Sequence, residues 1–233
     1  MDTFFFVLGI IGVISFSISG AMVAIDRQTD VFGVVFLAVV TTFGGGMTRD
    51  LLMGNVPPRI FSDGVSFAVS VATALLVFFF VRIFSDFYRR REALIYTVNN
   101  IFDALGIGIF AVTGAAIALE SPVPALSHPV AAAILGMVSA VGGGMIRDIV
   151  LRDIPFVLRK RIYALATLGG AALYVLLVSV GVGAVVASLA GTVLTFAVRM
   201  FATVFKWNLP KAIRQTDSLP VSDPQPTALS GKK

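Results

Sequence analysis

The chain contains no cysteine, only one histidine and few charged residues, which fill 13% of its 233 positions. Without cysteine there is no disulfide, no thiolate metal site and no cysteine nucleophile. The sequence also lacks a paired-histidine metal motif, a nucleophile elbow and a phosphate loop opening from a strand, which argues against an enzyme. Soluble domains contain about 25% charged residues, so this composition, with 57% hydrophobic residues, indicates a protein that folds in lipid.

The sequence contains several long runs of uncharged residues. A membrane-spanning helix needs about 20 predominantly apolar residues, and the runs at 4–25, 31–48 and 64–81 approach that length. Residues 162–198 form an uncharged run of 37 residues, which is too long for one span, so a turn at Gly181 and Gly183 is expected to divide it. We therefore predict an all-α integral membrane protein with seven transmembrane helices, at residues 3–25, 31–54, 64–83, 94–119, 129–152, 161–180 and 183–205.

An internal repeat organises these spans. Residues 43–50 read FGGGMTRD and residues 141–148 read VGGGMIRD, 98 positions later, while SGA at 19–21 matches TGA at 113–115, 94 positions later. Each copy holds three spans, and because three is odd the second copy must enter the membrane from the opposite face. We predict a first three-helix repeat at 1–92, a second, inverted three-helix repeat at 93–181, a seventh transmembrane helix at 182–206 and a disordered cytoplasmic tail at 207–233.

Lysine and arginine are distributed unequally between the two faces. The face with the N-terminus carries two cationic residues, Arg49 and Arg59, whereas the opposite face carries the other sixteen. The positive-inside rule places the basic face in the cytoplasm, so we predict an outside N-terminus and a cytoplasmic C-terminus. Basic cytoplasmic loops also account for the net charge of +5 without any nucleic-acid partner.

The two glycine triplets are the strongest local signal in the sequence. Gly44–Gly46 and Gly142–Gly144 lie inside predicted spans rather than in loops. Glycine costs about 1 kcal/mol relative to alanine in a helix interior, so three in a row are expected to bend or break each helix. Broken helices that meet near the membrane midplane are a common way to expose backbone carbonyls to an ion. The alternative is close helix packing against small residues.

An arginine–aspartate pair follows each triplet, Arg49-Asp50 in the first copy and Arg147-Asp148 in the second. Arginine inside a membrane needs a partner or a route to water. Adjacent residues of a helix point about 100° apart, so we expect each arginine to pair with a residue other than its neighbour. Two kinds of role fit: a structural ion pair that closes the helix end, or a functional role as a gate or as a contact for lipid headgroups.

Polar residues inside other spans are candidates for an ion path. Asp103 lies in the fourth span, where the first copy has Gly9, and it would either attract cations or pair with an arginine. The hydroxyls of Ser17, Ser19 and Thr113 would either contact a dehydrated cation or hydrogen-bond to their own helix.

Small residues at Gly183, Ala187 and Gly191 form a stripe in the seventh span that is expected to contact another helix, either in the same chain or in a second subunit. His128 falls in a predicted loop and is expected to be solvated rather than a ligand.

Together, the duplicated GGGM-x-RD motif, the segment Asp103-Ala104-Leu105-Gly106 and the unpaired seventh span resemble a prokaryotic trimeric intracellular cation (TRIC) channel over residues 3 to about 205. The resemblance implies a homotrimer in the prokaryotic inner membrane, with one pore per subunit bounded by spans two and five and kinked at the glycine triplets. It also implies conduction of K+, with Na+ less favoured, and no cofactor or resident metal. Membrane lipids would be its other partners.

Animal members of that family contact phosphoinositide through basic residues of the fourth span, and this chain lacks such a basic pair, so lipid regulation is not expected to carry over. The same bacterial domain is associated with glycine transport, so a small amino-acid transporter is the main alternative to a channel. A non-transporting scaffold and an intramembrane enzyme are two further alternatives.

Overall fold

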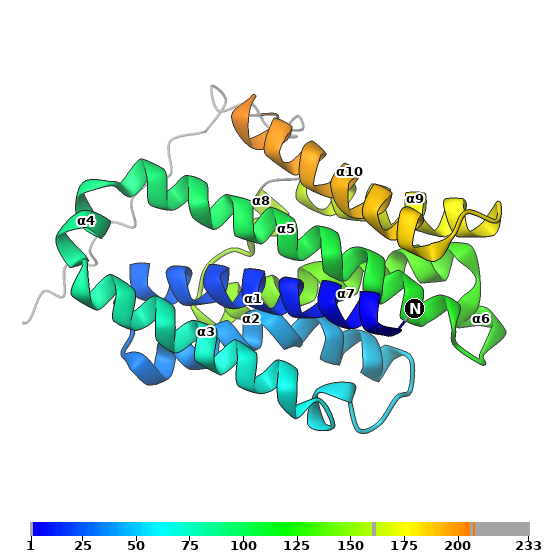
Figure 1. The fold of residues 1–233 in the computed structure, drawn as a ribbon, viewed down its shortest axis with the longest axis horizontal. Coiled ribbons are helices and arrows are strands. Elements are labelled where there is room, and N and C mark those ends of the chain that lie inside the picture. The colour runs from blue at the N-terminus through cyan, green and yellow to red at the C-terminus, as the bar shows by residue number, and fades with distance from the viewer. Residues whose placement is uncertain (1, 160–161, 206, 208–233) are drawn as a thin grey trace, which may run out of the picture.

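The computed structural model describes residues 2–159, 162–205 and 207, and within these residues the regular structure is entirely helical (Figure 1). Seven of the described helices are long and apolar enough to cross a membrane, as predicted from the sequence. They are α1 (Asp2–Asp26), α2 (Val31–Leu52), α3 (Gly64–Ile83), α5 (Glu92–Leu119), α7 (Pro129–Val150), α9 (Ile162–Ser179) and α10 (Ala184–Val204). Apart from Trp207, the predicted disordered tail lies outside the described residues.

Short helical turns lie in four of the connections: η1 (Arg59–Phe61), α4 (Ser85–Arg90), α6 (Pro124–Ser127) and α8 (Phe156–Arg159). Side chains cap the N-termini of three of the long helices. Asp30 accepts a hydrogen bond from the backbone N–H of Gly33 at 2.8 Å, and Asp63 accepts one from Ser66 at 3.0 Å. His128, expected to be simply solvated, caps α7 by accepting from Val130 N–H at 3.4 Å. Such caps satisfy backbone donors that have no partner inside the helix.

The long helices alternate in direction and form a single bundle (Figure 1). The N-terminus, η1 and α6 lie at one end of the bundle, here called the Arg59 end, and α4 lies at the opposite end, called the Arg27 end. α5 is the most buried span, packed against α1, α7, α9 and α10, whereas α3 is the most exposed. The two proposed repeats meet where α2 packs on α7 and α1 packs on α5.

The glycine triplets lie where α2 and α7 cross. Both helices run through their triplets without interruption, so of the predicted bend or break, the break is wrong. A β-carbon added at Gly45 would collide with the carbonyl oxygen of Ser139, and one added at Gly143 would collide with that of Thr41. A β-carbon at Gly142 would also lie 2.9 Å from the Cα of Gly45. These glycines therefore allow the two backbones to touch, which is the packing alternative.

The third glycine of each triplet has a different environment. A β-carbon on Gly46 would meet nothing nearer than Arg49 Nη2 at 3.8 Å, and one on Gly144 would meet Arg147 Nη2 and the Tyr163 hydroxyl at 3.8 Å. Alanine therefore fits at Gly46 and Gly144 but not at Gly45 or Gly143.

The stripe on α10 packs inside the chain. Gly191 lies against α9, where an added β-carbon would be 2.7 Å from the carbonyl oxygen of Gly170, and Ala187 is fully buried. Gly183 is exposed at the start of the helix. Of the two alternatives for the stripe, contact within the chain is therefore the one observed at Ala187 and Gly191.

The crossing gives a matched test of packing. We expect Gly45→Ala to destabilise the protein by about 1–3 kcal/mol or more, because the added methyl meets backbone that cannot rotate away. Gly46→Ala, one residue on, should be neutral or slightly stabilising, because alanine favours the helix. Thermal unfolding of both variants in detergent, with monodispersity as a second readout, checks this. Equal stabilities of the two variants would contradict the contact described for Gly45.

Candidate functional site

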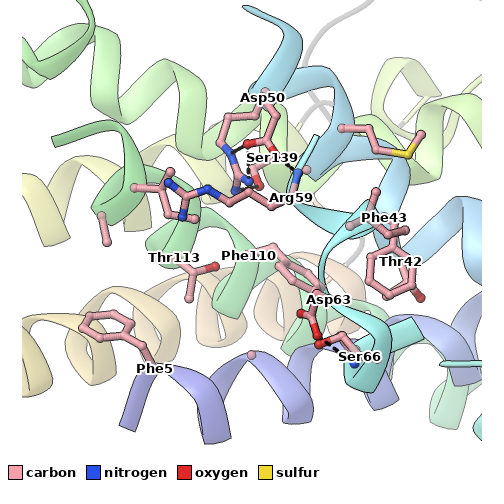
Figure 2. Close-up of a pocket in the computed structure, with 18 of the residues that line it drawn as sticks. Phe5, Thr42, Phe43, Asp50, Arg59, Asp63, Ser66, Phe110, Thr113 and Ser139 are labelled. Atoms are coloured by element: carbon pink, nitrogen blue, oxygen red, sulfur yellow. Dashed lines mark hydrogen bonds and ion pairs between the residues drawn. The ribbon is translucent and has the colours of Figure 1, made fainter. Parts of the chain in front are cut away.

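Arg49 and Asp50 form a buried ion pair at the Arg59 end of α2 (Figure 2). Asp50 Oδ1 accepts from Arg49 Nε at 3.0 Å and Nη2 at 2.6 Å, while Asp50 Oδ2 accepts from the backbone N–H of Arg59 at 3.0 Å. The expectation that the arginine would avoid its neighbour is wrong. Its long side chain bends across the angle between adjacent positions, and the backbone of Arg59 holds the carboxylate within reach.

Arg147 and Asp148 repeat this arrangement at the end of α7. Asp148 Oδ1 accepts from Arg147 Nε at 2.9 Å and lies 2.8 Å from Nη2, while Oδ2 accepts from the backbone N–H of Phe156 at 2.8 Å. Here too the arginine pairs with its neighbour, contrary to expectation. Both arginines are only 6% exposed. Each carboxylate thus ties the end of a central helix to the loop that follows it.

Asp103 is held by α9 and α10. Its Oδ2 lies 3.2 Å from Arg199 Nη2 and its Oδ1 accepts from the Tyr163 hydroxyl at 3.2 Å. The guanidinium of Arg199 also lies over the ring of Tyr163, 4.4 Å from its centroid, and 5.5 Å from that of Phe156. Of the two roles expected for Asp103, the ion pair with an arginine is therefore the one observed.

Neither partner of Asp103 was predicted from the sequence. Arg199 was counted among the basic residues of the Arg27 end, yet it is 2% exposed. Tyr163 was not singled out. One signal was available: an acid inside a span needs a partner, and Arg199 is the charged residue that interrupts the otherwise uncharged sequence of the seventh span.

The three candidate hydroxyls have different surroundings. Ser17 donates to Ser70 at 2.8 Å and shares a 3.0 Å hydrogen bond with Thr42, so it joins α1, α2 and α3. Thr113 bonds back to the carbonyl of Ile109 at 3.0 Å, but also lines a cavity. Ser19 lines a second cavity at the other end of the bundle.

The first cavity, called the Arg49 cavity, has a volume of about 380 Å³ and lies at the Arg59 end (Figure 2). Phe5, Phe43 and Phe110 form part of its wall. It carries three carboxylates and two arginines, and its polar lining consists of Thr42, Arg49, Asp50, Arg59, Asp63, Ser66, Thr113, Glu120 and Ser139. Carboxylates thus outnumber cationic groups in this cavity.

The second cavity, called the Arg147 cavity, has a volume of about 250 Å³ and lies at the Arg27 end. It carries four carboxylates and two arginines, and its polar lining consists of Ser19, Asp26, Arg27, Tyr96, Asn99, Asn100, Asp103, Arg147, Asp148 and Asp153. Arg27 and Asp153 both line this cavity and form an exposed ion pair. Within the described residues, no group of three or more His, Cys, Asp or Glu side chains is arranged to hold a metal ion.

A third hollow of about 790 Å³ lies between α1, α3, α4 and α5 at the Arg27 end. Tyr88 of α4 lines this hollow and donates a hydrogen bond to Asp26 Oδ1 at 2.8 Å. Burial, reinforced by this bond, raises the pKa of Tyr88 well above its usual range, so the phenol keeps its proton. The protonated phenol can therefore donate to Asp26, and this bond joins α4 to α1.

Comparison with known sequences places the chain in a family. A profile described as "Glycine transporter" matches residues 6–82 and 100–179, one segment in each half of the chain. The chain belongs to this family. Its relatives include the UPF0126 membrane protein YvgT of Bacillus subtilis, 33% identical over 91% of this chain and 98% of the relative. The UPF0126 inner membrane protein YadS of Escherichia coli is also 33% identical, over 87% of this chain and 92% of the relative.

Solved structures confirm the resemblance to the TRIC channels. A prokaryotic TRIC channel crystallised in 0.5 M KCl superposes with a TM-score of 0.78 at 30% identity, covering 90% of this chain and all of that one (100%). The TRIC trimeric intracellular cation channel orthologue from Rhodobacter sphaeroides gives 0.76 at 33% identity, over 87% of this chain and 98% of that one. Fold class and family are therefore as predicted, and the family is one of channels, not enzymes.

The Asp103 cluster predicts a large stability effect. Breaking a buried ion pair by removing one partner costs about 3–5 kcal/mol, so Asp103→Ala should lower the unfolding temperature strongly by leaving Arg199 uncompensated. Asp153→Ala breaks the exposed pair with Arg27 and should cost at most about 1 kcal/mol. Thermal unfolding of the two purified variants gives the comparison. An Asp103→Ala protein as stable as Asp153→Ala would show that the cluster contributes nothing.

Proposed function

We propose that the protein is a potassium-permeable cation channel with one pore in each subunit, running between the Arg49 and Arg147 cavities past the crossing of α2 and α7. The observation that carries this proposal is that the two cavities occupy equivalent places in the two repeats. Several residues that line the Arg147 cavity have repeat equivalents that line the Arg49 cavity. With the Arg147-cavity residue given first, the pairs are Ser19/Thr113, Val23/Ile117, Asp26/Glu120, Asn99/Phe5, Asp103/Gly9, Arg147/Arg49 and Asp148/Asp50.

The charge of the cavities supports cations as the permeant species. In each cavity the carboxylates exceed the arginines, by three to two in the Arg49 cavity and four to two in the Arg147 cavity. Such an excess of negative charge attracts cations to a cavity whose protein walls have a low dielectric constant. Hydroxyl and carbonyl oxygens near the crossing hold a monovalent ion weakly enough for it to leave again. The structural relatives described as TRIC cation channels support the same assignment.

Conduction requires movement at the crossing. In this structure the backbones of α2 and α7 touch at Gly45 and Gly143, between the two cavities. We propose that this state is closed and that bending at Gly44–Gly46 and Gly142–Gly144 opens the path. Gly46 supports that role, because it lines the Arg49 cavity and has free space around it.

A glycine transporter is the second candidate. The description of the family profile favours it, and so does the pair of separate cavities at opposite ends of inverted repeats, which is a common arrangement in transporters. A channel and a transporter differ in rate and in the species that crosses. Purified protein in liposomes should therefore be tested for both K+ flux and glycine uptake.

We expect K+ flux from wild-type protein and expect Glu120→Gln to reduce it a few-fold at low salt. Glu120 is exposed at the mouth of the Arg49 cavity, so removing its charge should lower the local cation concentration without affecting the fold. The difference should disappear near 1 M salt, where the Debye length falls to about 3 Å. Asp86→Asn, exposed on α4 and outside both cavities, is the control. Glycine uptake without K+ flux would contradict the channel.

We further propose that three subunits assemble in the inner membrane, with the Arg59 end outside and the Arg27 end in the cytoplasm. The Rhodobacter sphaeroides orthologue is described as trimeric, and relatives are named inner membrane proteins. The cationic asymmetry supports the orientation.

The lack of cysteine makes the orientation easy to test. Single cysteines at Ala125 in α6 and at Asp86 in α4 are exposed at opposite ends of the bundle. A membrane-impermeant thiol reagent added to intact spheroplasts should label Ala125→Cys rapidly and Asp86→Cys only after lysis. The reverse pattern would invert the proposed topology.

A further inference from the structure

The two arginine–aspartate pairs share the ion pair and the carboxylate's bond to the following backbone, but they differ at the arginine Nη1. Arg49 Nη1 donates to the hydroxyl of Ser139 at 3.1 Å. Arg147 Nη1 is buried and has no hydrogen-bond partner among the described residues. Leaving a buried charged donor unpaired is costly, so this difference between otherwise equivalent groups requires a physical explanation.

Thr41 is the repeat equivalent of Ser139, and Arg147 is the repeat equivalent of Arg49. Both correspondences follow the spacing of 98 residues between the repeats. The surroundings agree as well: a β-carbon on Gly114 would lie 2.9 Å from Ser139 Oγ, and one on the equivalent Gly20 would lie 2.7 Å from Thr41 Oγ1. Thr41 Oγ1 donates to the carbonyl of Leu37 at 2.6 Å, which leaves its lone pairs free to accept a bond from an arginine.

The two cavities also differ in how far they extend, and the deeper cavity lies beside the arginine that has the additional hydrogen bond. The Arg49 cavity extends to the centre of the bundle, where Thr42, Gly46, Phe110 and Ser139 line it. The equivalents of these four residues, Ala140, Gly144, Phe16 and Thr41, do not line the Arg147 cavity within the described part of the chain. The deep cavity is therefore at the end where the arginine is bound to the hydroxyl of the opposite repeat.

We propose that Ser139 and Thr41 are alternative positioning residues for the two arginines. In a second conformation, Arg49 releases Ser139, Arg147 binds Thr41, and the deep cavity lies at the Arg27 end instead of the Arg59 end. The repeats then exchange their conformations, and the unpaired donor moves from one arginine to the other. One hydrogen bond is lost and an equivalent one is gained, so the exchange leaves the number of hydrogen bonds at the two arginines unchanged. The inference goes beyond the proposed function, because the exchange would operate in a channel or in a transporter.

Two equivalent reporters make the exchange measurable. Ile117 lines the Arg49 cavity, Val23 lines the Arg147 cavity, and the two occupy matching positions in the repeats. Single cysteines at these positions in the cysteine-free protein are treated in detergent with a small thiol reagent. The ratio of the two labelling rates, Ile117→Cys over Val23→Cys, then reports which end carries the deep cavity.

Ser139→Ala removes the acceptor of Arg49 and should lower this ratio by about tenfold, the effect expected for losing one hydrogen bond to a charged donor. Adding Thr41→Val to Ser139→Ala should return the ratio towards the wild-type value, whereas adding Thr41→Ser, which keeps the hydroxyl, should leave it low. Ser188→Ala removes a buried hydroxyl of α10 that has no described partner and should not change the ratio.

A merely structural role would give different results. If Ser139 only packs helices together, Ser139→Ala will change both labelling rates in the same direction or neither, and Thr41→Val will not reverse the effect. Either result overturns the proposal. Gel filtration and thermal unfolding show that each variant is folded, and Thr41→Ser supplies a conservative variant if Thr41→Val is not. Absence of K+ flux from wild-type protein would defeat the channel but leave this labelling test unaffected.

Discussion

The backbones of α2 and α7 touch at Gly45 and Gly143, and most of the polar interior depends on that contact. Helices in lipid gain no hydrophobic energy by associating, so close approach through small residues provides much of their attraction. Because the helices are antiparallel (Figure 1), Arg49 and Arg147 lie on opposite sides of the crossing, and Arg49 reaches the side chain of Ser139 in the opposite repeat. Ser139 can accept from Arg49 only because its helix is held this close.

The buried arginines are each paired with a carboxylate. Arg49, Arg147 and Arg199 are all at most 6% exposed, and each has a carboxylate partner within 3.2 Å. A buried ion pair contributes little net stability, because desolvation offsets much of its attraction, but removing one member is expensive. Such pairs therefore fix where the helices lie more than they add to their stability. Asp50 and Asp148 fix the loops after α2 and α7, and Asp103 fixes α10 against α5 and α9.

The sequence predicted those features that depend on local composition. Seven spans and the duplicated motif follow from apolar runs and from repetition, and the structure has the spans within a few residues. What failed depended on side-chain flexibility and tertiary contact. The low helix propensity of glycine predicted a bend or a break at Gly44–Gly46, but the helix is continuous there and its glycines pack against the facing backbone. The angle between adjacent residues predicted that Arg49 would avoid Asp50, but an arginine side chain is long enough to bend back. Arg199 was assigned to a basic end because linear sequence does not show which face of α10 is buried.

Differences in sequence between the two repeats make the two ends of the molecule unequal. Phe16 and Phe110 occupy equivalent positions and contact each other, with ring centroids 5.1 Å apart, so near the centre the symmetry is retained. Further out it is lost, since Asn99 and Asp103 stand where the first repeat has Phe5 and Gly9. Asp103 also binds α10, a helix with no counterpart in the first repeat. An exchange of conformation between the repeats would therefore not be isoenergetic: the second repeat must move against the contacts of α10, whereas the first has no such restraint. On the exchange proposed above, this asymmetry favours the state in which the Arg49 cavity, rather than the Arg147 cavity, reaches the centre of the bundle.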